Sequence, residues 1–519
     1  MQSEEEEERA TLVAAQAAAV VRRVQADFHA VRGAFSTMPK RCVGAGRAAE
    51  GLRADWQRQL AYVREQCGFG YLRMHGLLGD DMGVYRENAA GQAEFNWQYI
   101  DEVYDFLLRI GMKPFVELGF CPGALASGKQ TIFWWAGNVT PPKDMERWRA
   151  LIAALLGHFS ERYGEAEVAT WYFEVWNEPN LPDFFAGTQA DYFALYAETA
   201  RAIKSVSKAY RVGGPATAGC AWVPEFIDYC VRQQAPVDFI STHDYAVDAG
   251  YLDESGTAGT ILSHDARSIY GNVLAVREQI ASSALPALEL HFTEWSSSYT
   301  PSDPLHDSYH NVPFILDKLK KVGTAADSMS YWVFSDIFEE AGPRFTPFHG
   351  GFGLLNYQDI CKPAFFAYQF LNRLGSIELS CTDESCYVTR DDAGNVQVLL
   401  WDFTITSPEK GENNQTFYRR VHPARAKGTA KLELSGLPPG NYMQRVYQVG
   451  YRVNDAYSAY LELGAPAQLT RAQVEQLRAD SDGRPTLETA RMIDRDGRFE
   501  SELELRENDV LLLVLQRRE

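Results

Sequence analysis

Trp171-Tyr-Phe-Glu-Val-Trp-Asn-Glu-Pro-Asn180 is the stretch that decides the fold of this chain. Its first six residues are aromatic or β-branched around a single glutamate, which is typical of a strand buried on both faces. Asn177 and Glu178 follow the strand directly, so polar side chains stand at its carboxyl end. Strands covered on both faces occur mainly in parallel sheets of α/β proteins. The stretch therefore predicts an α/β fold with chemistry at the strand ends.

The alternation of a short apolar run with a longer amphipathic stretch recurs from about residue 40 to residue 375. The predicted strands are Arg41–Gly46, Tyr71–Gly76, Pro114–Phe120, Trp171–Trp176, Val212–Ala216, Phe239–His243, Leu288–Glu294 and Ser328–Phe334. Eight strand–helix units are what a (β/α)8 TIM barrel requires. A doubly wound open sheet stays as the structural alternative, because periodicity does not show closure.

The pattern changes after residue 375, where short alternating strands are separated by Asp, Asn, Gly and Pro turns. This texture predicts an accessory all-β, sandwich-like domain. We therefore divide the chain into an N-terminal helical or strand extension (1–39), a (β/α)8 catalytic barrel (40–375) and a β-sandwich domain (376–519). Ala467–Asp480 is predicted as a helix or an extended loop within the last domain.

Charge and composition exclude several classes of partner. The 519 residues carry a formal net charge of −19, which disfavours binding to nucleic acid or to an anionic membrane surface. No apolar run reaches the length of a membrane-spanning helix. The acidic run Glu4–Glu8 opposes a signal peptide and fits the first turn of a helix, and the eight cysteines contain no CxxC pair. We expect a cytoplasmic protein with reduced thiols, and the sequence leaves open whether it forms a homo-oligomer.

The carboxyl ends of the strands in a parallel barrel converge on one face, where active sites are built. Glu178 ends the fourth predicted strand and Glu294 ends the seventh, so barrel closure places the two carboxyl groups near each other. Cleavage of a glycosidic bond needs such a pair, one protonated and one ionised. Aromatic residues make up 13% of the chain, and their faces can stack on sugar rings. This constellation favours a glycosidase.

Several longer strings surround these positions, namely Met74-His-Gly-Leu-Leu78, Asp80-Asp-Met-Gly-Val-Tyr85, Phe133-Trp-Trp-Ala-Gly-Asn-Val-Thr-Pro-Pro142, Trp176–Leu181 with Thr293-Glu294, Phe334-Ser-Asp-Ile-Phe-Glu-Glu340 and Phe348-His-Gly-Gly-Phe-Gly-Leu354. These strings resemble glycoside hydrolase family 39, in particular its bacterial β-xylosidases. They cover most of residues 40–375 and are specific there, whereas the C-terminal part matches more weakly. The resemblance implies a retaining, exo-acting β-xylosidase that releases xylose from the non-reducing ends of xylo-oligosaccharides.

The resemblance also implies roles for individual residues. Glu178 would be the general acid/base and Glu294 the nucleophile, while Asn177 would hydrogen-bond the sugar 2-hydroxyl. Other residues fall on positions that bind the sugar in that family, and these are His75, Phe133, Phe184, His243, Tyr245, Trp332, Glu339 and Glu340. Glu339 and Glu340 could form a fork for vicinal hydroxyls. Trp295 and the loop that starts at Ala341 depart from the family pattern, which bears on the preferred sugar rather than on the reaction.

Three alternatives remain at this stage. The same mechanism could act on another glycone, such as an arabinoside, a glucoside or a uronide. The barrel could bind carbohydrate without catalysis, although both carboxyl positions hold glutamate. The GxGxxA pattern at Gly44–Ala49 could indicate an oxidoreductase with a dinucleotide cofactor, but the next strand does not end in an acidic residue that would bind the ribose of that cofactor. We therefore expect no cofactor, and the sequence offers no convincing metal-binding motif.

Overall fold

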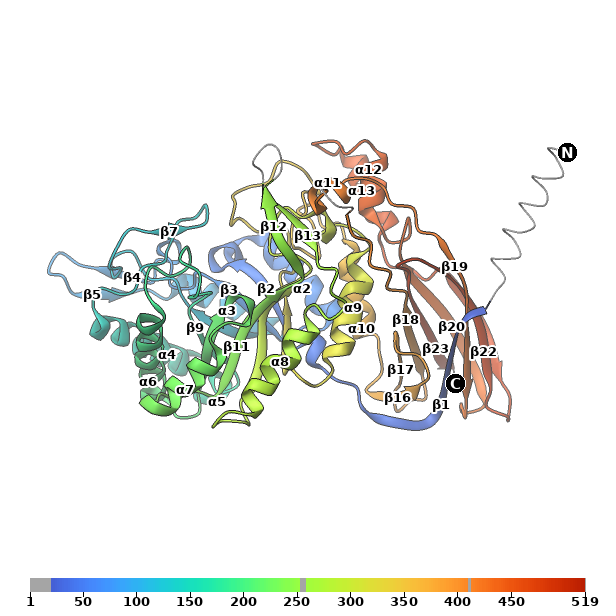
Figure 1. The fold of residues 1–519 in the computed structure, drawn as a ribbon, viewed down its shortest axis with the longest axis horizontal. Helices are drawn as coiled ribbons and strands as arrows, with labels where there is room; N and C mark the ends of the chain where they lie inside the picture. Colours follow the sequence, from blue (N-terminus) through green and yellow to red (C-terminus); the bar gives the residue numbers. More distant parts are fainter. Residues whose placement is uncertain (1–19, 253–257, 409–411, 519) are drawn as a thin grey trace.

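The computed structural model describes residues 20–252, 258–408 and 412–518. Within these residues, eight parallel strands close into a barrel, in which β15 pairs with β2 (Figure 1). The barrel strands are β2 (Cys42–Arg47), β3 (Tyr71–His75), β6 (Lys113–Leu118), β9 (Tyr172–Val175), β10 (Arg211–Thr217), β11 (Phe239–Tyr245), β14 (Glu289–Ser296) and β15 (Ser328–Tyr331). The TIM-barrel prediction is confirmed, and the open-sheet alternative is wrong.

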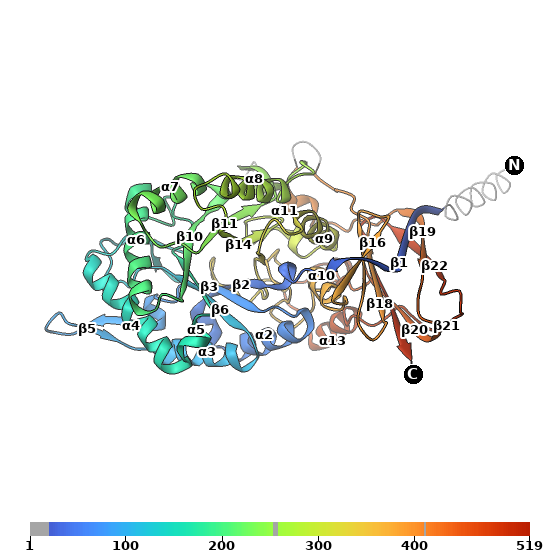
Figure 2. The same cartoon turned by 90° about the horizontal axis from the view of Figure 1, so that it is seen from below.

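A helix follows each barrel strand along the described chain, and these helices surround the barrel (Figure 2). Local sequence sets where they start: Asp144 accepts hydrogen bonds from the first turn of α4, and Thr188 with Asp191 forms a capping box on α6. The helices are α2 (Ala54–Cys67), α3 (Gln98–Arg109), α4 (Met145–Tyr163), α6 (Gln189–Val206), α7 (Val223–Gln233), α8 (Tyr270–Ala281), α9 (Asn311–Val322) and α10 (Pro363–Asn372).

The interior of the barrel is a packed floor of aromatic rings below a polar layer. Phe115, Tyr172, Phe239 and His291 stack or meet edge to face near the amino ends of the strands. Because side chains on one face of a strand recur every second residue, the next inward layer on β9 holds Glu174. The floor therefore supports a layer of buried charged groups, on which the strand ends are built.

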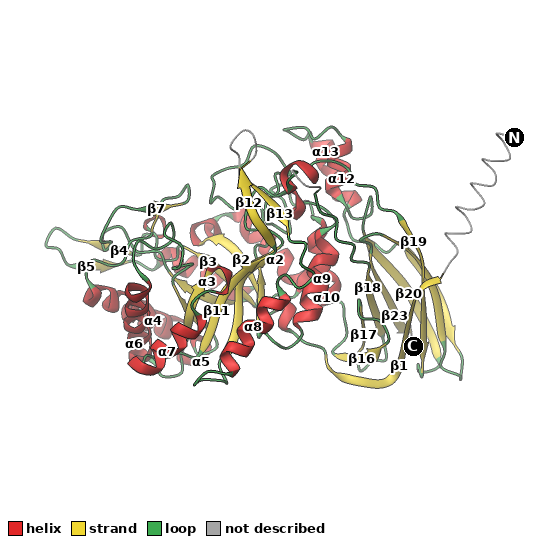
Figure 3. Cartoon of the chain, in the orientation of Figure 1, coloured by secondary structure: helices red, strands yellow, loops and turns green. Residues whose placement is uncertain are grey.

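A second, mostly antiparallel sheet forms the accessory domain, in the order β21-β20-β23-β18-β17-β16-β1-β19-β22 (Figure 3). Its strands are β1 (Val20–Ala34), β16 (Ile377–Cys381), β17 (Cys386–Arg390), β18 (Val396–Trp401), β19 (Ala426–Ser435), β20 (Gly440–Val449), β21 (Leu487–Ile493), β22 (Phe499–Arg506) and β23 (Val510–Arg518). β1 lies between β16 and β19 in this sheet. The part of the predicted N-terminal helix that precedes residue 20 lies outside the described residues.

The sheet curls around its own core and also packs on the barrel. Gln444 of β20 donates a hydrogen bond to Ser501 of β22 although these strands lie near opposite ends of the sheet order. On β18, Val398 belongs to the core of the β domain, whereas Trp401 packs with the barrel core. A sandwich-like body therefore arises from one sheet, and β18 carries apolar side chains on both faces because both faces are covered.

Smaller elements lie in the connections. They are β4 (Tyr85–Glu87), β5 (Ala93–Phe95), β7 (Thr131–Ile132), β8 (Gly137–Asn138), β12 (Val247–Leu252), β13 (Ala258–Leu262), α5 (Glu165–Val168), α11 (Asn414–Phe417), α12 (Ala456–Glu462) and α13 (Arg471–Asp480). The ambiguous stretch Ala467–Asp480 thus contains a helix. None of the helices in the described part of the chain is long and apolar enough to cross a bilayer.

Candidate active site

The end of β9 is turned sharply so that two consecutive side chains face the same space. Trp176 and Glu178 have φ angles of 71° and 46°, a left-handed conformation that costs a non-glycine residue about 1–2 kcal/mol. The backbone N–H of Glu178 donates to the carbonyl of Ala216 at 2.8 Å and fixes the turn. Asn177 and Glu178 both line the resulting cavity, which a regular strand would not allow.

A register shift has the same effect on β14. Its pairing with β11 slips between Thr242 and His243, so that His243 pairs with Glu294. Thr293 donates to Glu174 inside the barrel, and Glu294 accepts from Arg73, also inside the barrel. Strict alternation would send one of these two neighbours outward. The shift therefore brings Glu294 into the interior beside Thr293.

The two glutamates approach each other across the barrel. One carboxyl oxygen of Glu178, one of Glu294 and a ring nitrogen of His243 all lie within 4.8 Å of one another. Retaining glycosidases place their carboxyl groups about 5–5.5 Å apart, and inverting ones about 6.5–9.5 Å apart. The spacing is on the short, retaining side of these two ranges and favours direct attack by one carboxylate.

Both oxygens of Glu294 are held by strong donors. The guanidinium of Arg73 donates to Oε1 at 2.6 Å, and the hydroxyl of Tyr245 donates to Oε2 at 2.7 Å. Burial raises the pKa of Tyr245 well above its ordinary value, so its hydroxyl keeps its proton and remains a donor. These contacts fix the direction of the carboxylate, as a nucleophile requires.

Glu178 lies in a different electrostatic setting. Its Oε1 lies 2.9 Å from Nδ1 of His243, and no Lys or Arg in the described chain forms an ion pair with it. Burial raises the pKa of Glu178 to about 7, although His75 and Arg73 act in the opposite direction. A carboxyl group with such a pKa can give up a proton in one step and take one back in the next.

Arg73 is the central residue that sequence reasoning missed. Its buried guanidinium lies 2.7 Å from Glu174, 2.6 Å from Glu294 and 3.0 Å from Glu117, and it donates to Oδ1 of Asn177 at 2.8 Å. The last contact turns the amide nitrogen of Asn177 toward a prospective ligand. Arg73 precedes the predicted site residue His75 by two positions on β3, so strand alternation could have found it.

A cavity of about 600 Å³ opens above this charged layer. Most of the predicted site residues line it, namely His75, Phe133, Asn177, Glu178, Phe184, Tyr245, Glu294, Trp332 and Glu340. Phe133 and Phe184 meet edge to face and form an aromatic wall. The nine side chains come from the ends of β3, β9, β11, β14 and β15 and from the loops after β6, β9 and β15, so closure of the barrel gathers the carboxyl groups of Glu178, Glu294 and Glu340 in one cavity.

Two predicted sugar-binding residues do not line the cavity. The carboxylate of Glu339 is held by Arg47 at 2.8 Å and by Arg53 at 2.9 Å, so of the two glutamates in the predicted fork only Glu340 lines the cavity. His243 lies fully buried beneath Glu178, where its ring bonds Glu178 and Thr293. Its ring therefore contacts the carboxyl group of Glu178 rather than the cavity.

Comparison with known proteins decides the family. The family model described as glycosyl hydrolases family 39 matches residues 23–500. The chain belongs to glycosyl hydrolase family 39. This confirms the resemblance seen in the sequence and makes the protein a glycoside hydrolase.

Relatives within family 39 cover nearly the whole chain. A β-xylosidase of Caldicellulosiruptor saccharolyticus is 41% identical to this chain, and the match covers 84% of this chain and 87% of the relative. A β-xylosidase of Geobacillus stearothermophilus is 39% identical, and the match covers 93% of this chain and 94% of the relative. The crystal structure of a monomeric β-xylosidase from Caulobacter crescentus is 44% identical, covers 96% of this chain and 100% of its own, and superposes with a TM-score of 0.93.

The GxGxxA pattern has a packing explanation in this family 39 enzyme. A Cβ atom on Gly44 would clash with the indole of Trp332, and one on Gly46 would clash with the carboxylate of Glu50. Trp332 lines the cavity, so Gly44 makes room for a ring that forms part of the cavity wall. The glycines therefore serve the packing of the site, and their spacing gives no support to a dinucleotide-binding loop.

The only group of His, Cys, Asp and Glu side chains in the described ranges with spacing suited to a metal ion is Glu178, His243 and Glu294. The Arg73 guanidinium, 2.6 Å from Glu294, already supplies the positive charge that a metal ion would bring. We assign no metal ion to this group, because its members have complete roles as hydrogen-bonding partners.

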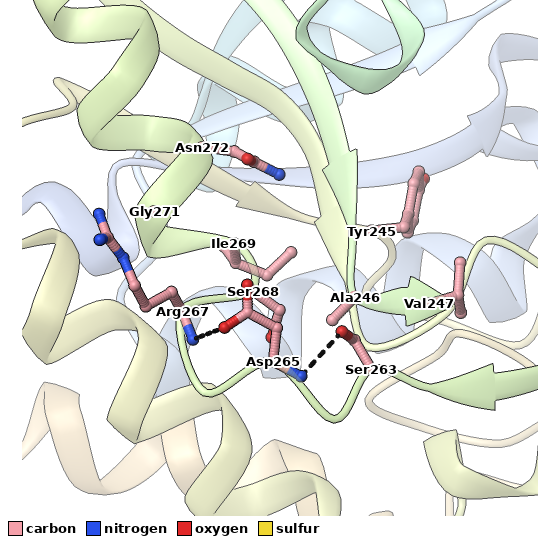
Figure 4. Close-up of a pocket in the computed structure, with 10 residues that line it drawn as sticks. All are labelled: Tyr245, Ala246, Val247, Ser263, Asp265, Arg267, Ser268, Ile269, Gly271 and Asn272. Atoms are coloured by element: carbon pink, nitrogen blue, oxygen red, sulfur yellow. Dashed lines mark hydrogen bonds between the residues drawn. The ribbon is translucent and has the colours of Figure 1, made fainter. Parts of the chain in front are cut away.

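A second cavity, of about 380 Å³, lies between the end of β11 and the start of α8 (Figure 4). It shares Tyr245 and Val247 with the larger cavity. Its lower wall is a turn in which Asp265 accepts from the backbone of Arg267 and donates from its own backbone to Ser263. Asp265 is the only acidic residue among its described lining, so the paired-carboxylate chemistry belongs to the larger cavity.

Proposed function

We propose that this family 39 enzyme is a retaining, exo-acting β-xylosidase that releases xylose from the non-reducing ends of xylo-oligosaccharides. The observation that carries the proposal is the close approach of the Glu178 and Glu294 carboxyl groups, within 4.8 Å, in settings of opposite character. Two family relatives named as β-xylosidases, each matched over most of its length, support the choice of sugar.

The reaction has two steps. Glu294 attacks the anomeric carbon while Glu178 protonates the departing oxygen, which gives a glycosyl-enzyme ester and the shortened oligosaccharide. Water then attacks the same carbon and gives its proton to Glu178, which releases xylose with its original configuration and restores both carboxyl groups. Asn177 donates from its amide nitrogen to the 2-hydroxyl, because Arg73 occupies its oxygen.

The closed end of the cavity supports exo action. The backbone N–H of Trp134, in the loop between β7 and β8, donates to the carbonyl of Glu340 in the loop after β15 at 2.8 Å. The two loops thus meet beside Phe133 and Glu340, which both line the cavity. A sugar chain blocked at this side can present only its terminal unit to the two glutamates.

The polar lining of the cavity bears on the glycone. No Lys or Arg is among its described lining residues, and Arg73 beneath it already serves three carboxylates. A uronic acid would bring a further negative charge near Glu340 without a cation to receive it. A neutral pentose fits this setting, and His75 and Glu340, 3.5 Å apart, offer hydrogen bonds to its hydroxyl groups.

A panel of aryl glycosides with one leaving group tests the sugar preference. We expect kcat/KM for the β-D-xyloside to exceed that for the β-D-glucoside by at least about tenfold, because a pocket shaped for a pentose must exclude the extra hydroxymethyl group. The glucuronide should react still more slowly. Initial rates at several substrate concentrations give the values, and a glucoside, arabinoside or glucuronide that reacts faster than the xyloside would refute the proposed specificity.

We also propose that the enzyme acts in the cytoplasm on short oligosaccharides. Its eight cysteines are all unbridged thiols, which suits a reducing compartment. Six of them are buried, where they behave as small apolar side chains. Fractionation of the source cells, with activity on an aryl xyloside as the readout, tests this placement.

A further inference from the structure

A chain of hydrogen bonds runs from Glu178 into the base of the barrel. Oε1 of Glu178 lies 2.9 Å from Nδ1 of His243, and Nε2 of the same ring lies 3.1 Å from Oγ1 of Thr293. The Thr293 hydroxyl in turn lies 2.7 Å from Glu174, which bonds Arg73 at 2.7 Å. Arg73, Glu174, Thr293 and His243 are fully buried, and only Glu178 reaches the cavity, so the groups below Glu178 can satisfy one another but not water.

The direction of each hydrogen bond follows from the Arg73 end. Arg73 is always charged and can only donate. Burial alone would raise the pKa of Glu174, but the charge of Arg73, with the hydroxyl groups of Ser241 and Thr293, lowers that pKa below its ordinary value. Glu174 is therefore ionised and can only accept. The single hydroxyl proton of Thr293 goes to Glu174, which leaves only a lone pair of Thr293 facing His243.

His243 must then carry a proton on Nε2. Burial lowers the pKa of His243 to about 4, so its ring is neutral near pH 7 and has a single N–H. With that proton on Nε2, Nδ1 presents a lone pair to Glu178 at 2.9 Å. An ionised Glu178 would place a lone pair of Oε1 against the lone pair of Nδ1, whereas a protonated Glu178 donates a hydrogen bond to Nδ1.

We propose that Glu174, Thr293 and His243 are positioning residues that keep Glu178 protonated. They hold the proton of the neutral His243 ring on Nε2, so Nδ1 cannot donate a hydrogen bond to an ionised Glu178. This inference rests on the proposed role of Glu178 as the general acid. The same relay serves the second step, since a Glu178 that has given up its proton is left without a donor and becomes a stronger base for water.

Other ionisable groups also face Glu178 and His243, and the test must leave them in place. They are Arg73 and His75 on β3, Glu117 on β6, Tyr245 on β11, Glu294 on β14 and Glu340 after β15. Replacing Thr293 by valine removes one hydroxyl, keeps the branched shape and alters none of these charges. His243 is then free to move its proton to Nδ1 and donate to an ionised Glu178.

The first test compares pH profiles of kcat/KM for an aryl β-xyloside with a poor leaving group. The wild-type rate should fall as pH rises through about 7, where Glu178 loses its proton. In Thr293→Val this alkaline limb should move to lower pH by about one unit, since a hydrogen bond to the charged form is gained. Thr293→Ser should restore the wild-type limb. Thr242→Val, a buried threonine of β11 that bonds Thr217 instead, should leave the limb unmoved.

The second test reads the histidine directly and does not depend on activity. In ¹⁵N NMR spectra of the wild-type protein, the signal that disappears in His243→Asn should report a neutral ring protonated at Nε2. A ring protonated at Nδ1, or an alkaline limb identical in the wild type and Thr293→Val, would overturn the relay. An Nε2 proton in a protein that cleaves no β-xyloside would instead refute the proposed function and leave the relay standing.

Discussion

Replacement of Glu294 by alanine is expected to lower kcat/KM for an aryl β-xyloside by about 10⁴-fold or more. Without the carboxylate, no group in the site can form the glycosyl-enzyme, and loss of a nucleophile costs rates of this order in other covalent enzymes. Arg73 keeps Glu117 and Glu174 as partners, so the variant retains two of the three carboxylates that neutralise its buried cation. Initial rates with a xyloside that bears a good leaving group measure the loss.

A matched control lies on the same strand. Glu289 is also on β14, but at the opposite end of the barrel, where it accepts from Tyr172. Glu289→Gln should retain activity within a few-fold of the wild type, because its carboxyl group lies far from the cavity along the strand. Activity of Glu294→Ala within tenfold of the wild type would show that another group is the nucleophile.

Replacement of Glu178 by alanine is expected to slow substrates according to their leaving groups. A poor leaving group needs the proton that Glu178 supplies, whereas a strongly acidic phenol departs without it. The loss should therefore be about 10²–10⁴-fold greater for the poor leaving group. With the good leaving group the glycosyl-enzyme should accumulate, because no base activates water for its hydrolysis.

Added azide should rescue Glu178→Ala with the good leaving group. Azide needs no general base, and it fits the space left by the missing carboxyl group, so it should attack the glycosyl-enzyme and form β-xylosyl azide. Product analysis by NMR detects this compound and its configuration. Equal losses for all leaving groups, together with no effect of azide, would contradict the acid/base role of Glu178.

The barrel could be predicted because its signals are local. Strands such as β9 and β11 read as apolar runs, and each is followed by a helix-spaced pattern before the next begins. β1 could not be predicted as part of the C-terminal sheet, because its partner β19 is some 400 residues away in sequence. Long-range pairing of this kind depends on the whole fold and leaves no local pattern.

The site residues could be predicted where the barrel strands keep a regular geometry. His75 and Trp332 fall at strand ends and line the cavity, as expected. Glu339 was misplaced because adjacent acids look alike in sequence, and its partners Arg47 and Arg53 approach only after the barrel closes. The side chains of Thr293 and Glu294 both point into the barrel because of a register shift, which no residue pattern in the sequence predicts.

Trapping of the glycosyl-enzyme tests the central claim most directly. The probe is a 2-deoxy-2-fluoro-β-xyloside with a good leaving group. Its fluorine slows both steps, because fluorine destabilises the positive charge at the anomeric centre. The good leaving group keeps formation of the glycosyl-enzyme faster than its hydrolysis, so the covalent intermediate accumulates. Mass spectrometry of the intact protein and its peptides should then find one fluoroxylosyl group, bound to Glu294. A sugar attached to any other residue, or hydrolysis with no covalent adduct and inverted configuration, would contradict the account.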